Sequence, residues 1–149
     1  MNNSLVYLGL AVLAGAVIPL QTSLNANLSR GLGGPGYAAL VVFMVAAATM
    51  LTTAVLLKQP VPTLAQAASV QWWSWLGGVF GALYVFLLVF LAPRLGIASV
   101  TGFVVAGQVL AAVLIDHFGL LKFPVHALNP GRLAGVALLL AGLYLVKRF

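Results

Sequence analysis

The stretch WWSWLGGVFGALYVFLLVFLA, residues 72–92, decides the fold of this chain. It contains no charged residue and exceeds the roughly 18 apolar residues that can cross a bilayer as a helix. Working outward, we find four more long apolar stretches and predict helices over residues 5–29, 37–57, 95–117 and 131–147. A β-barrel would show alternating strands of about 10 residues instead. The sequence therefore predicts an all-α integral membrane protein, with five transmembrane helices in one domain over residues 1–149.

The composition supports this interpretation. Of 149 residues, 63% are hydrophobic and 5% are charged, whereas a soluble domain carries about 25% charged residues. The net charge of +6 does not indicate nucleic acid, because the Lys and Arg residues lie at or between the ends of apolar stretches and form no patch. The absence of cysteine excludes disulfides and thiol chemistry. We expect the lipid bilayer as a partner and no nucleic acid.

The distribution of basic residues leaves the orientation open. Five crossings place the two ends of the chain on opposite sides of the membrane. Three basic residues then share the side of residue 1, and four lie opposite: Lys58, Lys122 and Arg132 against Arg30, Arg94, Lys147 and Arg148. The side of a membrane protein with more Lys and Arg residues tends to face the cytoplasm, and a difference of one residue gives only a weak preference. Two interpretations remain: a single orientation with the C-terminus inside, or dual topology with antiparallel pairing.

Few polar residues lie within the predicted helices. Gln21 and Asn25 are four apart and share one helix face, Gln108 lies in the middle of helix 95–117, and Tyr84 lies within 72–92. Amides and hydroxyls in a membrane either join helices by hydrogen bonds or line a substrate path. We interpret these four residues as candidates for substrate binding.

Asp116 is the only carboxylate and lies near the end of helix 95–117. A negative charge is unfavourable at a helix C-terminus, so we expect an ion pair with Arg132 or Lys122. The alternative is a proton site. There is no acid pair, metal-spaced cluster or nucleotide-binding glycine loop. The sequence therefore predicts no catalytic residues, no metal, no cofactor and no enzyme activity.

Small residues recur at the spacing that lets membrane helices approach closely. They occur as Gly77-x-x-x-Gly81 and as Ala98-x-x-x-Gly102-x-x-x-Ala106. In the last helix, Gly135 and Gly142 lie among leucines. We expect this terminal helix, through Gly135 and Gly142, to contact a second subunit.

Several motifs together resemble one known family. They are Pro19-x-Gln21-x-x-x-Asn25, Trp75-Leu76-Gly77-Gly78-x-x-Gly81-Ala82, Pro93-Arg94-Leu95-Gly96, Gly107-Gln108, Ile115-Asp116-His117-Phe118-Gly119 and Arg132-x-x-Gly135. In this order they resemble the short YdcZ-like proteins of the bacterial inner membrane, within the drug/metabolite transporter superfamily. The resemblance covers nearly the whole chain.

The resemblance implies a five-helix unit equivalent to half of a ten-helix transporter, and kinship with four-helix multidrug exporters that act as antiparallel dimers. Those exporters carry a glutamate in their first helix, where this chain has Gln21 and Asn25. This difference argues against proton antiport and cationic drugs. We expect a multi-pass homodimer that exports a small metabolite or xenobiotic by alternating access. The alternative is a non-transporting subunit that pairs with or regulates a second membrane protein.

Overall fold

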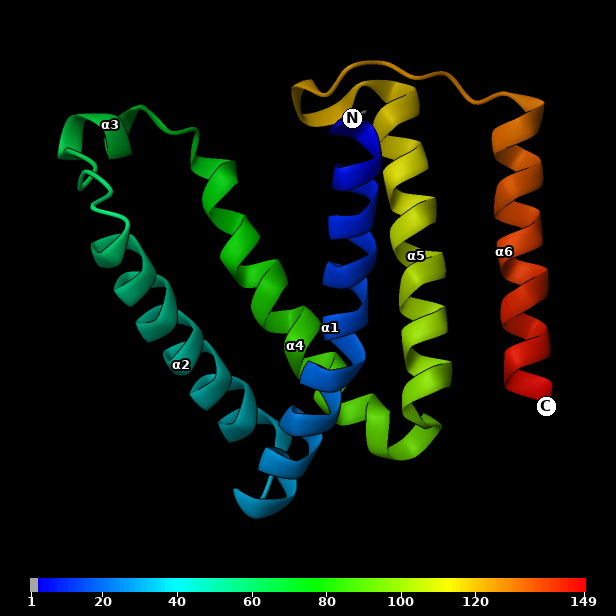
Figure 1. Ribbon diagram of the computed structural model, residues 1–149, viewed down its shortest axis with the longest axis horizontal. Helices are drawn as coiled ribbons and strands as arrows, with labels where there is room; N and C mark the ends of the chain where they lie inside the picture. The colour runs from blue at the N-terminus through cyan, green and yellow to red at the C-terminus, as the bar shows by residue number, and fades with distance from the viewer. Residues whose placement is uncertain (1–2) are drawn as a thin grey trace. The chain divides into compact units, whose positions relative to one another are not determined.

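The protein is seen here in a computed structural model that describes residues 3–149. All regular secondary structure in that range is helical (Figure 1). Five helices are long and apolar enough to cross a membrane, which confirms the expected fold class. They are α1 (Asn3–Gly31), α2 (Pro35–Leu56), α4 (Leu76–Leu95) with the preceding 3₁₀ turn η1 (Trp72–Trp75), α5 (Ile97–Phe118) and α6 (Pro130–Arg148). The short helix α3 (Leu64–Ser69) and the 3₁₀ turn η2 (Leu120–Lys122) lie in the connections.

The chain forms two compact units, and each is described by itself. One unit is Leu20–Arg94, and the other combines Met1–Pro19 with Leu95–Phe149. Helix α1 therefore contributes its first part to one unit and its second part to the other.

In the unit Leu20–Arg94, a small core joins α1, α2 and α4. Ala38 and Ala39 of α2 are buried against Val85 and Val89 of α4. The partly buried side chains around this core are Leu28, Val42 and Tyr84. The alanines have no long side chains to hold the helices apart, which is how membrane helices pack closely. The core lies near the start of α2, and α3 joins the other ends of α2 and α4 (Figure 1).

Helices α1 and α2 end with the same capping geometry. After α1, Gly33 has a φ of 76°, and the N–H of Gly34 donates to the carbonyl of Ser29 at 3.0 Å. After α2, Lys58 has a φ of 52°, and the N–H of Gln59 donates to the carbonyl of Ala54 at 2.9 Å. Both are Schellman motifs, in which a left-handed residue closes the last turn and satisfies orphan carbonyls. Lysine in place of glycine makes the second motif the more strained.

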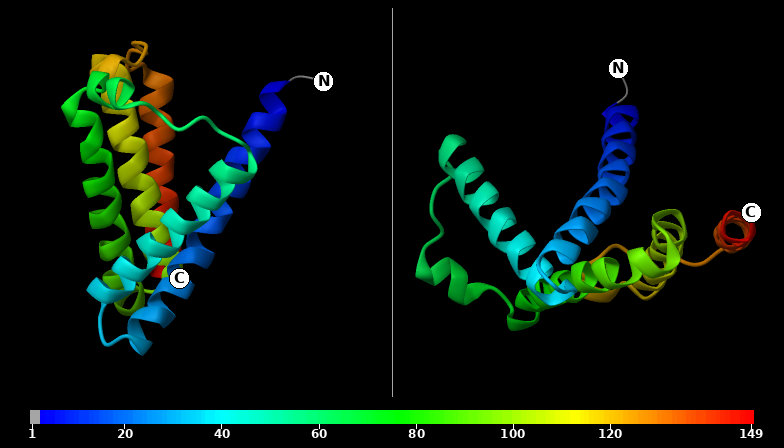
Figure 2. Two further views of the ribbon diagram at one scale, coloured as in Figure 1. Left: turned by 90° about the vertical axis from the view of Figure 1, so that its left-hand side faces the viewer. Right: turned by 90° about the horizontal axis from the view of Figure 1, so that it is seen from below.

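In the other unit, α5 and α6 run side by side in opposite directions (Figures 1 and 2). Leu143 of α6 is buried, and its side chain fills the space above Gly102 of α5. Gly119, with a φ of 58°, ends α5. Asn129 caps the start of α6 by accepting a hydrogen bond from the N–H of Arg132 at 2.9 Å.

The end of α4 differs from the sequence prediction. The predicted membrane-crossing stretch ends at residue 92, before Pro93. Instead α4 continues to Leu95, and the turn comes at Gly96, which has a φ of 80°. A proline in the last turn removes only one backbone hydrogen bond, and the Arg94 guanidinium donates to the carbonyl of Phe90 at this end of the helix.

Candidate functional site

Two candidate binding residues lie within the unit Leu20–Arg94, near its core. Asn25 of α1 is 8% exposed, and it precedes Leu28, which packs against the core, by one helical turn on the same face. Tyr84 of α4 packs against the same core. Its hydroxyl oxygen is buried and has no hydrogen-bond partner. A buried hydroxyl without a partner costs about 1–3 kcal/mol. The Tyr84 hydroxyl is therefore free to bind a further polar group.

The two glutamines have a different environment. Gln21 of α1 and Gln108 of α5 are both exposed on the single chain. They belong to different units, and their part in substrate binding, predicted from the sequence, stays a prediction. In a membrane, lipid offers an exposed glutamine side chain no hydrogen bond, so a second chain or a water-filled path is the more favourable surrounding.

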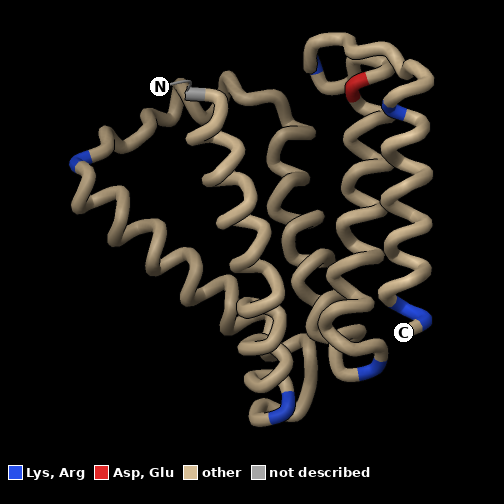
Figure 3. Tube along the Cα trace, turned by 45° about the vertical axis from the view of Figure 1, so that its right-hand side comes forward, with Lys and Arg blue, Asp and Glu red and all other residues tan. Residues whose placement is uncertain are grey.

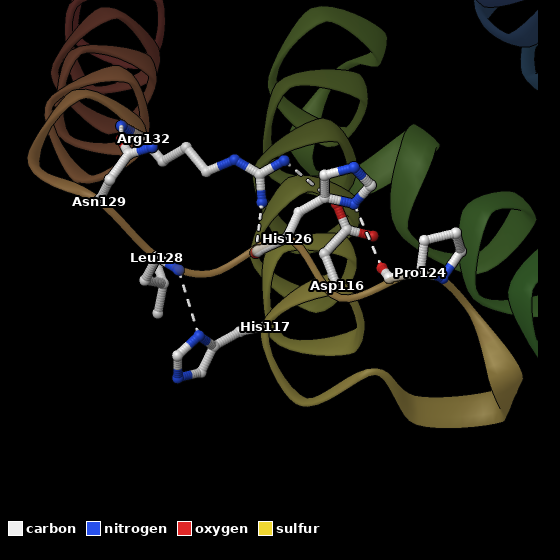
Figure 4. A network of polar contacts seen from close by, with 7 residues as sticks. All are labelled: Asp116, His117, Pro124, His126, Leu128, Asn129 and Arg132. Atoms are coloured by element: carbon white, nitrogen blue, oxygen red, sulfur yellow. Dashed lines mark hydrogen bonds and ion pairs between the residues drawn. The ribbon is translucent and has the colours of Figure 1, made fainter.

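A polar network lies where the α5–α6 connection folds back on the end of α5 (Figure 4). Arg132, in the first turn of α6, reaches Asp116 at the end of α5, with 3.4 Å between Nη2 and Oδ2. Its Nη1 donates to the carbonyl of His126 at 2.9 Å. The N–H of His126 in turn donates to the backbone carbonyl of Asp116 at 2.9 Å. Arg132, rather than Lys122, is thus the basic neighbour of Asp116.

Two histidines, His117 near the end of α5 and His126 in the connection, also bind backbone groups. Nδ1 of His117 accepts a hydrogen bond from the N–H of Leu128 at 3.1 Å, which places the proton of a neutral ring on Nε2. Nδ1 of His126 lies 3.2 Å from the carbonyl oxygen of Pro124, so this nitrogen is the donor. The side chains of Asp116 and Arg132 are about one third exposed, at 35% and 33%. The network therefore fixes a connection near the membrane surface and leaves the carboxylate reachable by water.

Gly135 and Gly142 of α6, the candidate interface residues, have open space around them. A Cβ atom at either position would meet nothing within 4 Å on the same chain. Beside Gly142, an apolar hollow of about 440 Å³ runs between α5 and α6; its other lining residues are Gly102, Val105, Leu138, Leu139, Leu143 and Val146. The subunit thus packs α5 on α6 through Gly102 and leaves the two other glycines uncovered.

Charged side chains are confined to helix ends and connections (Figure 3). Within residues 3–149, no group of three or more His, Cys, Asp or Glu side chains could hold a metal ion. The groups near the core of Leu20–Arg94 include the amide of Asn25 and the phenol hydroxyl of Tyr84. They can bind a ligand by hydrogen bonds.

Sequence reasoning did not find how His117, His126 and Leu128 tie down the connection. Several partners are far apart in the sequence, and four of the five contacts described above involve backbone groups. The signal in the sequence was the polar pair Asp116-His117 at the end of a predicted helix, from which only the ion pair of Asp116 was predicted.

Comparisons with known proteins agree with these observations. The family described as "Putative inner membrane exporter, YdcZ" matches residues 6–145. The chain is also similar to Inner membrane protein YdcZ of Escherichia coli (strain K12), with 32% identity over 81 residues. That alignment covers 54% of this chain and 54% of the relative, so the match spans about half the length of the curated protein. No solved structure matches the chain.

Proposed function

Because this chain belongs to the YdcZ family of inner membrane proteins, we propose that it exports a small metabolite or xenobiotic across the bacterial inner membrane. Family membership confirms the resemblance stated above, and with the five spans it makes the chain a multi-pass protein of that membrane. Substrate is bound by Asn25 and Tyr84, joined by Gln21 and Gln108. Transport follows alternating access.

The buried, unpartnered hydroxyl of Tyr84 is the observation that carries this proposal. An orphan polar group inside a membrane protein is costly, and such groups tend to mark functional sites. Asn25 lies near the same core and offers a donor and an acceptor. Both side chains are uncharged, which favours a neutral substrate that forms hydrogen bonds over a cationic one.

In this proposal a dimer provides the ten helices of a complete transporter. Ten-helix relatives in the superfamily suggest that two five-helix chains are needed. Inverted repeats are common in transporters, and two oppositely inserted copies would create one. The nearly balanced Lys and Arg count permits both insertions. The uncovered glycines Gly135 and Gly142 of α6 offer a surface for close contact between the copies.

The binding site is tested by a ligand-stabilisation screen on purified protein, with Tyr84→Phe as the key variant. Removing the orphan hydroxyl should leave the thermal midpoint of the unliganded protein unchanged or higher. A metabolite that stabilises the wild type should stabilise Tyr84→Phe and Asn25→Ala much less, and proteoliposome efflux of that metabolite should fall in parallel. Equal stabilisation of the wild type and both variants would remove these residues from the site.

The antiparallel dimer is tested by locking orientation. Two or three lysines added to a single connection should fix one insertion and abolish efflux of the screened metabolite. Co-expression of two oppositely locked variants should restore it. Full efflux by one locked variant alone would leave a parallel dimer or a monomer as the working form.

The second candidate is a non-transporting subunit that pairs with or regulates another membrane protein. The exposed side chains of Gln21 and Gln108 favour this second candidate, because another membrane protein could supply their hydrogen-bond partners. Reconstitution separates the two candidates, because a subunit of this kind gives no efflux by itself and gains activity when the second protein is added.

A further inference from the structure

The connection between α2 and α4 is unusually apolar for a segment outside the spans. Helix α2 ends at Leu56, and the next membrane-crossing segment begins at Trp72. Between them lies a single charged residue, Lys58. Two of its apolar side chains project almost fully, Val61 at 88% and Leu64 at 90% exposure. Burial of such side chains against an apolar surface would be favourable.

Helix α3, within this connection, has two different faces. Helical spacing places Leu64, Ala67 and Ala68 on one side, and Gln66 and Ser69 on the other. The short helix is therefore amphipathic, with its apolar side uncovered.

Several polar groups at the two ends of α3 are bonded within the segment. The N–H of Thr63 donates to the Gln66 side chain at 2.8 Å, and the N–H of Gln66 donates to the Thr63 hydroxyl at 3.2 Å. This reciprocal pair is a capping box. The Ser69 hydroxyl donates to the carbonyl of Gln66 at 2.7 Å. These groups can leave bulk water without losing their hydrogen bonds.

The flanks of α3 carry the residues that membrane interfaces favour. Trp72, Trp73 and Trp75 follow it, all exposed. Tryptophan concentrates at the level of the lipid headgroups. Next to Trp75 lies a mainly apolar hollow of about 500 Å³, whose other lining residues are Pro60, Val61, Pro62, Gln66, Ala67 and Val70.

We propose that residues 58–75 form a phospholipid-binding surface that lies in the plane of the membrane interface. Leu64 and Val61 enter the outer part of the acyl chains, and Gln66 and Ser69 face the headgroups. Lys58, which the Schellman motif places directly after α2, contacts lipid phosphate. This surface is independent of the proposed transport activity.

Charge and tethering favour lipid over a second copy of the chain. The segment is joined to a membrane span at each end, so it cannot move far from the bilayer surface. It contains one cation and no acid, which complements anionic headgroups. A second copy could offer Lys58 only Asp116, the sole side-chain carboxylate, and that group already contacts Arg132.

The chain has no cysteine, so a single introduced thiol can carry a spin label without other changes. We would label Leu64→Cys and Ser69→Cys in phosphatidylethanolamine–phosphatidylglycerol vesicles, and compare collisions with oxygen and with a water-soluble nickel chelate. The label at position 64 should favour oxygen, and the label at 69 should favour nickel. Nickel preference at both positions would overturn the proposal, because the segment would lie in water. A label at 64 shielded from both reagents would also overturn it, in favour of a protein contact.

A second comparison disturbs the surface itself, with the label at Val61→Cys as reporter. Adding Leu64→Glu should lower the oxygen-to-nickel ratio at position 61 several-fold, because the apolar face then carries a charge. Ser69→Glu, on the polar face, is the matched control and should leave that ratio unchanged. Equal ratios in the two variants would contradict the assigned orientation. Leu64 is exposed, so this substitution removes no internal contact that the fold needs.

Discussion

The close approach of α5 and α6 at Gly102 leads to a quantitative prediction. A Cβ atom at Gly102 would overlap Cδ1 of Leu143 and lie 3.7 Å from its Cγ. Leu143 is 8% exposed, and to relieve the overlap its side chain must move from its packed position toward the hollow beside Gly142. Overpacking of this kind typically costs about 1–3 kcal/mol. Alanine also gains about 1 kcal/mol over glycine in helix propensity, so the effect of packing must be separated from that of propensity.

Gly107, on the same helix, provides this separation. A Cβ atom there would meet nothing within 4 Å. Gly107→Ala therefore stabilises the helix through the higher helix propensity of alanine and causes no overlap. We expect Gly102→Ala to unfold with a free energy lower than that of Gly107→Ala by about 1–3 kcal/mol. The measurement is an SDS titration of detergent-solubilised protein, followed by far-ultraviolet circular dichroism.

A double-mutant cycle identifies the contact. In a Leu143→Ala background the overlap is absent, so Gly102→Ala should lower the free energy of unfolding markedly less there. The coupling energy between the two substitutions should be about 0.5–3 kcal/mol. Equal unfolding free energies for Gly102→Ala and Gly107→Ala would refute the reasoning. A Gly102→Ala cost that is unchanged by Leu143→Ala would show that another residue is responsible.

Three further predictions concern α6 and its connection. Gly142→Leu, at a position with open space on its own chain, should abolish the dimer in analytical ultracentrifugation and leave the subunit folded; a dimer that persists would exclude Gly142 from the interface. Asp116→Asn removes an ion pair that is one third exposed and should cost no more than about 1 kcal/mol, with efflux retained; loss of efflux at unchanged stability would identify a proton site instead. Asn129→Ala removes the cap of α6 and should cost about 0.5–2 kcal/mol in SDS unfolding, whereas Asn129→Ser should keep most of that stability; equal losses would argue against the cap.

The five spans could be predicted from the sequence because the bilayer imposes a length and an apolar composition on each helix. Some helix ends differ from the prediction, although residues that favour the observed ends are present in the sequence. Thr63-Leu64-Ala65-Gln66 has the capping-box spacing, and α3 begins there although no helix was predicted. The predicted stretch ends at residue 92, before Pro93, but α4 continues to Leu95 and is followed by Gly96, whose φ is 80°. In both places a short-range signal was present in the sequence.

The packing partners could not be predicted, because they depend on how the helices rotate and approach one another. The small-residue repeat of α5 indicated a close contact, but it did not indicate that Leu143 would fill the space at Gly102. In the same way, the sequence shows a tyrosine in a span, and only the packed helices show that the Tyr84 hydroxyl lacks a partner. The ion pair was easier to anticipate, because Asp116 had so few basic neighbours to choose from.

The helices of this protein differ in length, and bilayer thickness therefore acts on them unequally. Helix α1 has 29 residues and α6 has 19, which correspond to about 43 Å and about 28 Å of helix. A hydrocarbon core of about 30 Å matches α6 and is shorter than α1. We expect thinning of the membrane to increase the tilt of α1 or to push its polar end further into the headgroups. Lipid chain length should therefore act on the helix that carries Gln21 and Asn25.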